Sequence, residues 1–288
     1  MKVCAALEKP FDPLIAVTRP HAGEAPTARN LLKVMGETSQ IGESHLAETV
    51  DHRVQDAYSL RCMPAVHGAV KMGIKYAKQV LETEANSSTD NPLVFADAGK
   101  ILSCGNFHGM PVAHAMDFAG IVISSLASIS HERISKFIST QMSDLPPFLA
   151  PNGGLNSGHM IVQVASASLV SENKVLAHPA SVDSMPTSAE KEDHVSMGTI
   201  AARKFTQILK NAQNVVAMEF LAGTQALDMI APLKPAAGVQ VAYDAIRAKV
   251  PYAKEDRIFA KDVEQIRKLI LSGELLGIVE KSIGALEL

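Results

Sequence analysis

Residues 111–139 read PVAHAMDFAGIVISSLASISHERISKFIS, a stretch whose only proline is its first residue. A run of this length with apolar residues near helical spacing predicts one long helix. Residues 193–229 also lack proline, and we expect a second helix there, over roughly 50 Å long at about 1.5 Å per residue. A third helix is expected to begin at about Pro64 and to end near Ala85. These long helices indicate an all-α fold.

Shorter elements complete the prediction. LVF and KILS flank ADAG at 96–99, a pattern typical of a small β-hairpin. Four prolines before residue 27 indicate an irregular start. Further helices are expected at Thr27–Met35, Ser157–Ala177, Val239–Lys249, Ala260–Ser272 and Glu274–Ala285. We therefore predict a long-helix bundle with one hairpin, divided into a bundle portion at 1–231 and short C-terminal helices at 232–288.

Small side chains are frequent on the expected helices, as in VQVASASLVSE at 162–172. Small residues let helix backbones approach closely, so helices rich in them are expected to be packed on several sides. Three long helices joined by long polar loops form an incomplete bundle. We expect other chains to cover its remaining faces.

The composition excludes several classes of protein. The chain has 288 residues, 47% of them apolar, and a formal net charge of −3 without a basic stripe. Nucleic acid is therefore an improbable partner. No apolar run is expected to span a bilayer, and the N-terminus does not resemble a signal peptide, so we expect a soluble cytoplasmic protein. Cys4, Cys62 and Cys104 are too scattered for a disulfide framework or a zinc site.

Gln55, Tyr58 and Arg61 are spaced by three residues, so on a helical turn they would share one broad face. The planar guanidinium of Arg61 suits bidentate binding of a carboxylate. The Tyr58 hydroxyl can donate a hydrogen bond, or act as a base where a nearby cation lowers its pKa. The alternative interpretation is a stacked Tyr–Arg pair with a structural glutamine at a subunit contact.

Phe107 and Glu192 are the other two candidates. Phe107 lies in GNFHG, directly after the predicted hairpin, where it could stack on an aromatic ligand or plug a turn. Glu192 falls near the expected start of the long helix, so capping of that helix is the main alternative to a functional role. Asp193 is the better cap candidate, which would leave Glu192 free to face a cavity. His108 is expected to be a structural histidine.

Five polar motifs occur in an order that resembles the second half of the aromatic amino acid ammonia-lyases, most closely the histidine ammonia-lyases. The motifs are QDAYSLRC (55–62), EANSSTDNPL (84–93), GNFHG (105–109), GLNSG (154–158) and SAEKEDHVSMG (188–198). The resemblance covers nearly the whole chain. It implies a carbon–nitrogen lyase that converts histidine to urocanate and ammonia, with no metal needed for the chemistry.

The resemblance also implies roles for the candidate residues. Arg61 would clamp the substrate carboxylate, Tyr58 would act near the reacting carbon, and Gln55 would line the same pocket. Phe107 would line the active site too. Glu192 would meet the substrate imidazole, as ligand or proton acceptor. The two residues before this glutamate are commonly Asn-Gln in the family, whereas Glu190 and Lys191 stand here, which changes the local charge.

The family's electrophilic cofactor, a methylidene-imidazolone (MIO), forms from an internal Ala-Ser-Gly. The sequence contains no such tripeptide, so we expect the cofactor in an N-terminal half and expect this chain alone to be inactive. The resemblance implies partnership with that half or with a full-length relative, in a tetramer-like core. The alternatives are half of a tyrosine or phenylalanine ammonia-lyase or aminomutase, and a non-catalytic remnant that binds a full-length relative.

Overall fold

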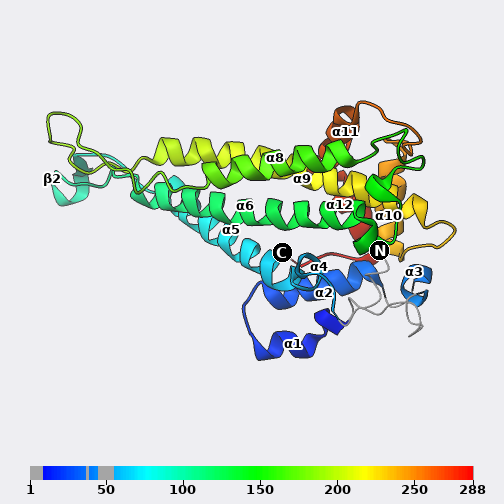
Figure 1. Ribbon diagram of the computed structural model, residues 1–288. Helices are drawn as coiled ribbons and strands as arrows, with labels where there is room; N and C mark the ends of the chain where they lie inside the picture. The colour runs from blue at the N-terminus through cyan, green and yellow to red at the C-terminus, as the bar shows by residue number, and fades with distance from the viewer. Residues whose placement is uncertain (1–8, 37–38, 45–54, 288) are drawn as a thin grey trace. The chain divides into compact units, whose positions relative to one another are not determined.

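The computed structural model describes residues 9–36, 39–44 and 55–287, and these are mostly helical (Figure 1). The expected long helices are present. The structure forms them as α5 (Met63–Ala85), α6 (Met110–Ile138), α8 (Met160–Leu176) and α9 (Gly198–Met229). The predicted all-α class with one small hairpin is confirmed for the part of the chain that the structure describes.

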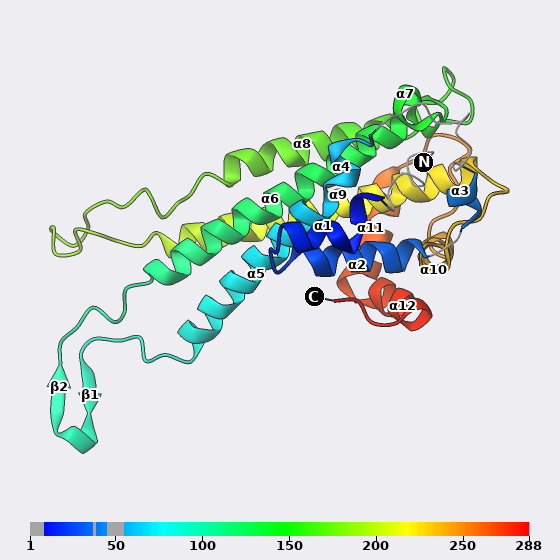
Figure 2. The ribbon, with the colours of Figure 1, turned by 90° about the horizontal axis from the view of Figure 1, so that it is seen from below.

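The hairpin consists of β1 (Leu93–Phe95) and β2 (Lys100–Leu102), which pair antiparallel with Val94 opposite Ile101. Gly99 closes the turn with a φ of 61°, a conformation that glycine adopts without steric cost. Figure 2 shows the hairpin at the end of two extended segments that connect it to α5 and α6.

The shorter helices agree with the prediction near the C-terminus and differ at the start. The prolines do not keep the start irregular, because Asp12 caps a helix that opens with Pro13, with Leu14 N donating to Asp12 Oδ1 at 2.8 Å. The remaining elements are η1 (Lys9–Phe11), α1 (Pro13–Thr18), α2 (Glu24–Met35), α3 (Gln40–Glu43), α4 (Tyr58–Arg61), η2 (Ala96–Ala98), α7 (Thr140–Ser143), η3 (Pro147–Leu149), α10 (Ala237–Arg247), α11 (Phe259–Leu271) and α12 (Glu274–Ile283).

The described chain divides into two compact units. Unit 1 holds the described residues up to Lys71 together with Ser125–Ser171 and Asn211 onward, and unit 2 holds Met72–Ser124 and Glu172–Lys210. The division at residue 231, predicted from the sequence, rests on a different criterion and stays a prediction.

Unit 1 contains the larger apolar core, in which α10, α11 and α12 pack around the C-terminal part of α9 (Figure 1). Leu221, Ile246 and Ile266 are almost completely buried there. Buried Gln225 on α9 exchanges hydrogen bonds with both main-chain groups of Ala253, at 2.9 and 3.1 Å. These bonds satisfy polar groups inside the core and hold the 251–257 loop against α9.

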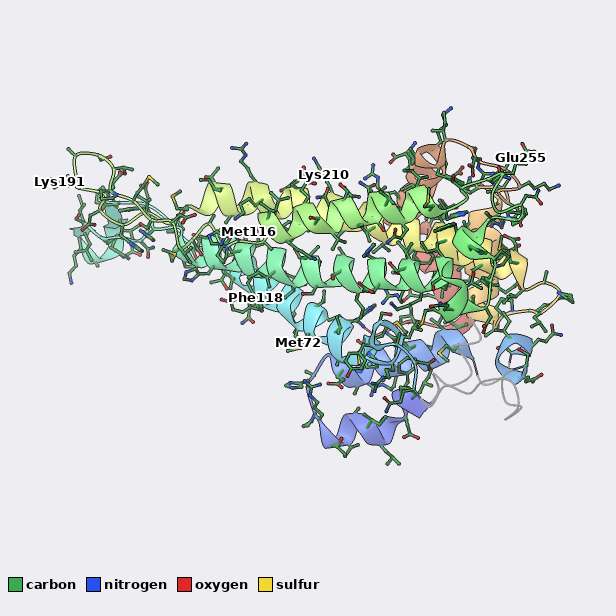
Figure 3. The ribbon with its side chains drawn as sticks, in the orientation of Figure 1. Met72, Met116, Phe118, Lys191, Lys210 and Glu255 are labelled. Carbon is green, nitrogen blue, oxygen red and sulfur yellow. The ribbon has the colours of Figure 1, made fainter. Side chains whose placement is uncertain are left out.

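The core of unit 2 is built from small side chains. Ala77 of α5 packs with Ala115 and Ala119 of α6, and Phe205 of α9 fills the adjoining space. Figure 3 shows Met72, Met116 and Phe118, which come from two of these helices. Met116 is buried, whereas Phe118 and Tyr76 form an exposed edge-to-face pair with ring centroids 5.7 Å apart. This pair adds to the exposed apolar surface. We expected from the sequence that other chains cover such surface.

One sequence expectation about membranes needs correction. Among the described residues, α6 is long and apolar enough to cross a membrane by length and composition. In its most apolar window, however, 56% is buried inside the protein. Burial of this kind is typical of a helix in a protein core.

The close approach of α2 and α5 depends on glycine. A Cβ atom at Gly68 would lie 2.7 Å from the carbonyl carbon of Gly23, so Gly68→Ala should destabilise unit 1 by about 1–3 kcal/mol. Gly277 on α12 has open space around it, so Gly277→Ala should be neutral or stabilise by up to about 1 kcal/mol. Urea unfolding followed by circular dichroism distinguishes the two, and equal effects would contradict the packing argument.

Candidate functional site

Three of the candidate residues lie on or beside the short α4 turn of unit 1. Tyr58 and Arg61 are its first and last residues, whereas Gln55 lies in a bend before the turn. The Ala57 carbonyl accepts hydrogen bonds from Leu60 N and Arg61 N, so the turn begins after Ala57. The expected single helical face therefore holds for Tyr58 and Arg61 and is wrong for Gln55.

Tyr58 and Arg61 form the stacked pair that the structural alternative predicts. The Arg61 guanidinium carbon lies 4.6 Å from the centre of the Tyr58 ring, and Nε of Arg61 donates to the Asp56 carbonyl at 3.0 Å. Tyr58 is 72% exposed. Among the residues that the structure describes, no hydrogen bond from Nη1 or Nη2 of Arg61 is seen, and these donors can bind an anionic ligand next to a phenol.

A small cavity of about 170 Å³ adjoins Arg61 on its other side. Asp12 and Glu24 line this cavity together with apolar side chains. Two carboxylates would repel a carboxylate ligand, so the cavity does not suit the substrate that the sequence predicts. The exposed side of the Tyr58–Arg61 pair is the better candidate.

Phe107 lies in unit 2, in the loop that follows β2, and its side chain is 56% exposed. The loop is held by its neighbours: Asn106 donates to the Ser88 carbonyl at 2.5 Å, and Cys104 N donates to Asn91 Oδ1 at 2.7 Å. The EANSSTDNPL segment thus supports the loop that carries Phe107. A held aromatic ring with a free face can stack on a planar ligand.

Glu192 also lies in unit 2, in a closed turn. Its main chain pairs with that of Thr187, with Thr187 N donating to the Glu192 carbonyl at 2.9 Å. The Thr187 hydroxyl donates to the Glu192 carboxylate at 2.6 Å. Hydrogen bonds from Thr187 and Ser188 hold the pKa of Glu192 below its usual value. The side chain is an exposed, oriented anion.

The expectation that Glu192 or Asp193 opens the long helix is wrong. Helix α9 begins at Gly198, directly after Met197, whose φ of 57° is left-handed and interrupts helical geometry. Ser188, Ala189 and Glu190 also have positive φ values. Ala189 and Glu190 have good helix propensity, but the backbone pairing of the turn overrides it. Capping of α9 therefore does not explain the Glu192 carboxylate.

His108 has the structural role that the sequence suggests. Its Nε2 lies 3.0 Å from the carbonyl oxygen of His194, and the two imidazole rings stack with centroids 5.8 Å apart. This contact ties the Phe107 loop to the segment that follows Glu192. Figure 3 labels Lys191 in that same polar connection.

The structure thus gathers the candidates into two sets. Tyr58 and Arg61 are in direct contact in unit 1 with Gln55 nearby in sequence, while Phe107 and Glu192 lie on adjoining loops of unit 2. Sequence reasoning missed Thr187, because the pattern gives no sign that residues five apart are paired. Within the described ranges, no group of three His, Cys, Asp or Glu residues is arranged to hold a metal ion.

Comparison with known proteins identifies the family of this chain. The family model "Aromatic amino acid lyase" matches residues 1–248, and the chain belongs to this family.

Named relatives lie within it. Histidine ammonia-lyase from Alkaliphilus oremlandii is 49% identical over 273 residues, which are 95% of this chain and 53% of that protein. The crystal structure of histidine ammonia-lyase from Trypanosoma cruzi is 38% identical with a TM-score of 0.87, covering 98% of this chain and 54% of that one. Tyrosine aminomutase from Streptomyces globisporus is 32% identical with a TM-score of 0.87, covering 99% and 59%.

The chain spans about half the length of the curated relatives it matches, and it corresponds to their C-terminal portion. The similarity to both an ammonia-lyase and an aminomutase shows that enzymes with different reactions share this fold.

Two histidines in unit 1, buried His159 and partly buried His67, lie apart from the exposed candidates. Burial lowers the pKa of His67 to about 4, and neighbouring Arg133 lowers it further. Burial also lowers the pKa of His159 to about 4, with Arg247 and Arg257 nearby. His159 packs on Phe259, with centroids 4.8 Å apart, and neither of its ring nitrogens has a hydrogen-bond partner among the described residues.

These histidines predict sensitivity to acid. Each binds a proton more readily in the unfolded chain, so stability is complete above about pH 6.5 and falls as the pH drops towards 4, by up to about 3 kcal/mol per residue. His159→Phe should roughly halve this loss without lowering stability at pH 7, because the ring still packs and two unpaired nitrogens disappear. Urea titrations at pH 7 and 4.5 test this. An undiminished acid loss would contradict it, and exposed His114→Asn is the control.

Proposed function

We propose that this chain supplies substrate-binding and catalytic residues to a histidine ammonia-lyase, which eliminates ammonia from histidine to give urocanate. Tyr58 and Glu192 are the catalytic residues of this proposal, and Gln55, Arg61 and Phe107 bind substrate. The observation that carries it is the Tyr58–Arg61 pair, with a guanidinium stacked on an exposed phenol at 4.6 Å.

The pair suits an amino acid substrate. The free edge of the guanidinium can bind the substrate carboxylate bidentately. This places the α-carbon near the neighbouring phenol hydroxyl, which can exchange a proton with the reacting centre. The residue that binds the carboxylate, Arg61, and the residue that transfers the proton, Tyr58, would then both lie on the short α4 turn.

Glu192 supports histidine as the substrate. Its carboxylate is oriented by the Thr187 hydroxyl at 2.6 Å, and its lowered pKa keeps it ionised. An ionised carboxylate can accept a hydrogen bond from an imidazole N–H, whereas a phenyl ring offers it no partner. The similarity to tyrosine aminomutase supports an aromatic amino acid aminomutase or lyase as the second candidate.

The family depends on the MIO group, which supplies an electrophile that turns the amine into a leaving group. The printed sequence has no Ala-Ser-Gly from which that group could form, so its source lies outside these residues. The exposure of Tyr58 and Phe107 fits residues that complete a site together with other protein surfaces. We propose a cytoplasmic assembly with an N-terminal lyase half, in which these residues need not all serve one site.

The first test assembles this chain with an N-terminal lyase part that carries Ala-Ser-Gly. Arg61→Ala should raise KM, because the substrate carboxylate loses its ionic partner, at a cost on the order of 2–5 kcal/mol. Tyr58→Phe should mainly lower kcat, because the ring remains and only the hydroxyl is lost. The ultraviolet absorbance of urocanate follows both.

Two controls accompany this test. Exposed Arg203→Ala on α9 should leave both kinetic constants unchanged, and the chain alone should form no urocanate. An unchanged kcat/KM in Arg61→Ala would remove Arg61 from the site. Urocanate formation by the chain alone would contradict the composite site.

The second test concerns substrate choice. In the assembled enzyme, Glu192→Gln should lose roughly a hundredfold or more in kcat/KM on histidine, because the glutamine can no longer accept a proton from the imidazole. The loss on phenylalanine or tyrosine should be far smaller. Glu190→Gln, in the same turn, is the matched control. It should leave kcat/KM unchanged on histidine and on phenylalanine or tyrosine. Equal losses on all substrates would show that Glu192 does not select histidine.

A further inference from the structure

A largely buried ion pair contacts the α4 turn, with the Glu219 side chain 20% exposed. Arg133 of α6 is 7% exposed, and its Nε and Nη2 donate to the two carboxylate oxygens of Glu219 on α9 at 2.5 and 2.8 Å. The Ser130 hydroxyl donates to the same carboxylate at 2.6 Å. Two parallel bonds of this kind fix the plane of the guanidinium as well as its position.

The third nitrogen of Arg133 is directed at the site turn. Its Nη1 donates to the main-chain carbonyl of Ser59 at 3.2 Å and lies 3.3 Å from Nε2 of His67. Arginine can only donate, so Nε2 must accept, which requires a neutral imidazole with its proton on Nδ1. The lowered pKa of His67 agrees with a neutral ring at pH 7. Ser59 is the residue between Tyr58 and Leu60 on α4.

We propose that Arg133 is a positioning residue for the reaction, held by Glu219, and that it fixes the α4 turn through the Ser59 carbonyl so that Tyr58 and Arg61 keep their mutual orientation. The inference rests on the proposed function, because it concerns how the catalytic and carboxylate-binding side chains are presented. The turn has only four residues, and a helix so short has little stability of its own, so an outside anchor determines its geometry.

A second buried pair in unit 1 provides a matched control. The guanidinium of Arg247 on α10 pairs with Asp228 on α9, and the two side chains are 13% and 18% exposed. Its Nη1 donates to the Val250 carbonyl at 2.9 Å. This pair has the same chemistry and similar burial, but its main-chain acceptor belongs to the 248–251 segment instead of α4.

The experiment compares Arg133→Lys with Arg247→Lys. A lysine can still reach its carboxylate, but it has no second arm for the main-chain carbonyl. In the chain itself, the amides of residues 57–62 should exchange with deuterium at least ~10-fold faster in Arg133→Lys and at the wild-type rate in Arg247→Lys. In the assembled enzyme, Arg133→Lys should lose at least ~10-fold in kcat/KM, through a lower kcat and a higher KM, whereas Arg247→Lys should stay within about twofold.

The possible outcomes are distinct. An assembled wild-type enzyme without ammonia-lyase activity defeats the proposed function, while exchange in the isolated chain still tests the anchor. Unchanged exchange in Arg133→Lys overturns the inference, as do equal effects of the two lysine variants, which would indicate general loosening. Faster exchange with an unaltered kcat/KM also overturns it, because the anchor would then not orient the site. If Arg133→Lys does not fold, the isosteric Glu219→Gln replaces it with the same expectations.

Discussion

A guanidinium and a carboxylate can remain inside a helical core only if each is fully hydrogen-bonded, since an unpaired buried charge is strongly destabilising. Arg133 and Glu219 meet this condition in unit 1 through Ser130 and through a main-chain carbonyl. The bonds between Arg133 and Glu219 link α6 to α9. The remaining donor, Nη1 of Arg133, bonds to the Ser59 carbonyl of α4. The bond that satisfies the last donor of Arg133 in the core is therefore also a bond that holds the exposed α4 turn.

Much of the fold follows from local sequence rules. Proline at the start of α5 and α6 marks where those helices begin, and ADAG marks the hairpin, because these residues restrict the backbone by themselves. The start of α9 could not be found in this way. Acidic Glu192 and Asp193 are typical of a first helical turn, but the pairing of Thr187 with Glu192 and the left-handed Met197 exclude a helix start there. Such pairing depends on the folded turn and leaves no periodic signal.

The candidate site divides in the same manner. Tyr58 and Arg61 could be predicted as neighbours, because a spacing of three brings side chains together on any helical turn. Gln55 could not be placed, because the turn begins only after Ala57. Thr187 and Arg133 went unnoticed because their importance lies in partners distant or irregularly spaced in sequence. Residue type reveals which groups could do chemistry, whereas the groups that orient them emerge only from the folded contacts.

The turn between Thr187 and Glu192 bears on how the proposed preference for histidine could change. Its two ends are joined by main-chain and side-chain hydrogen bonds, Ser188 also bonds to the carboxylate, and the side chains of Glu190 and Lys191 are exposed. Evolution can therefore exchange those residues without moving the carboxylate. Glu190 and Lys191 occupy such positions, where Asn-Gln is common in the family. Related enzymes can therefore differ in the charge of this surface while the Glu192 carboxylate stays in the same position.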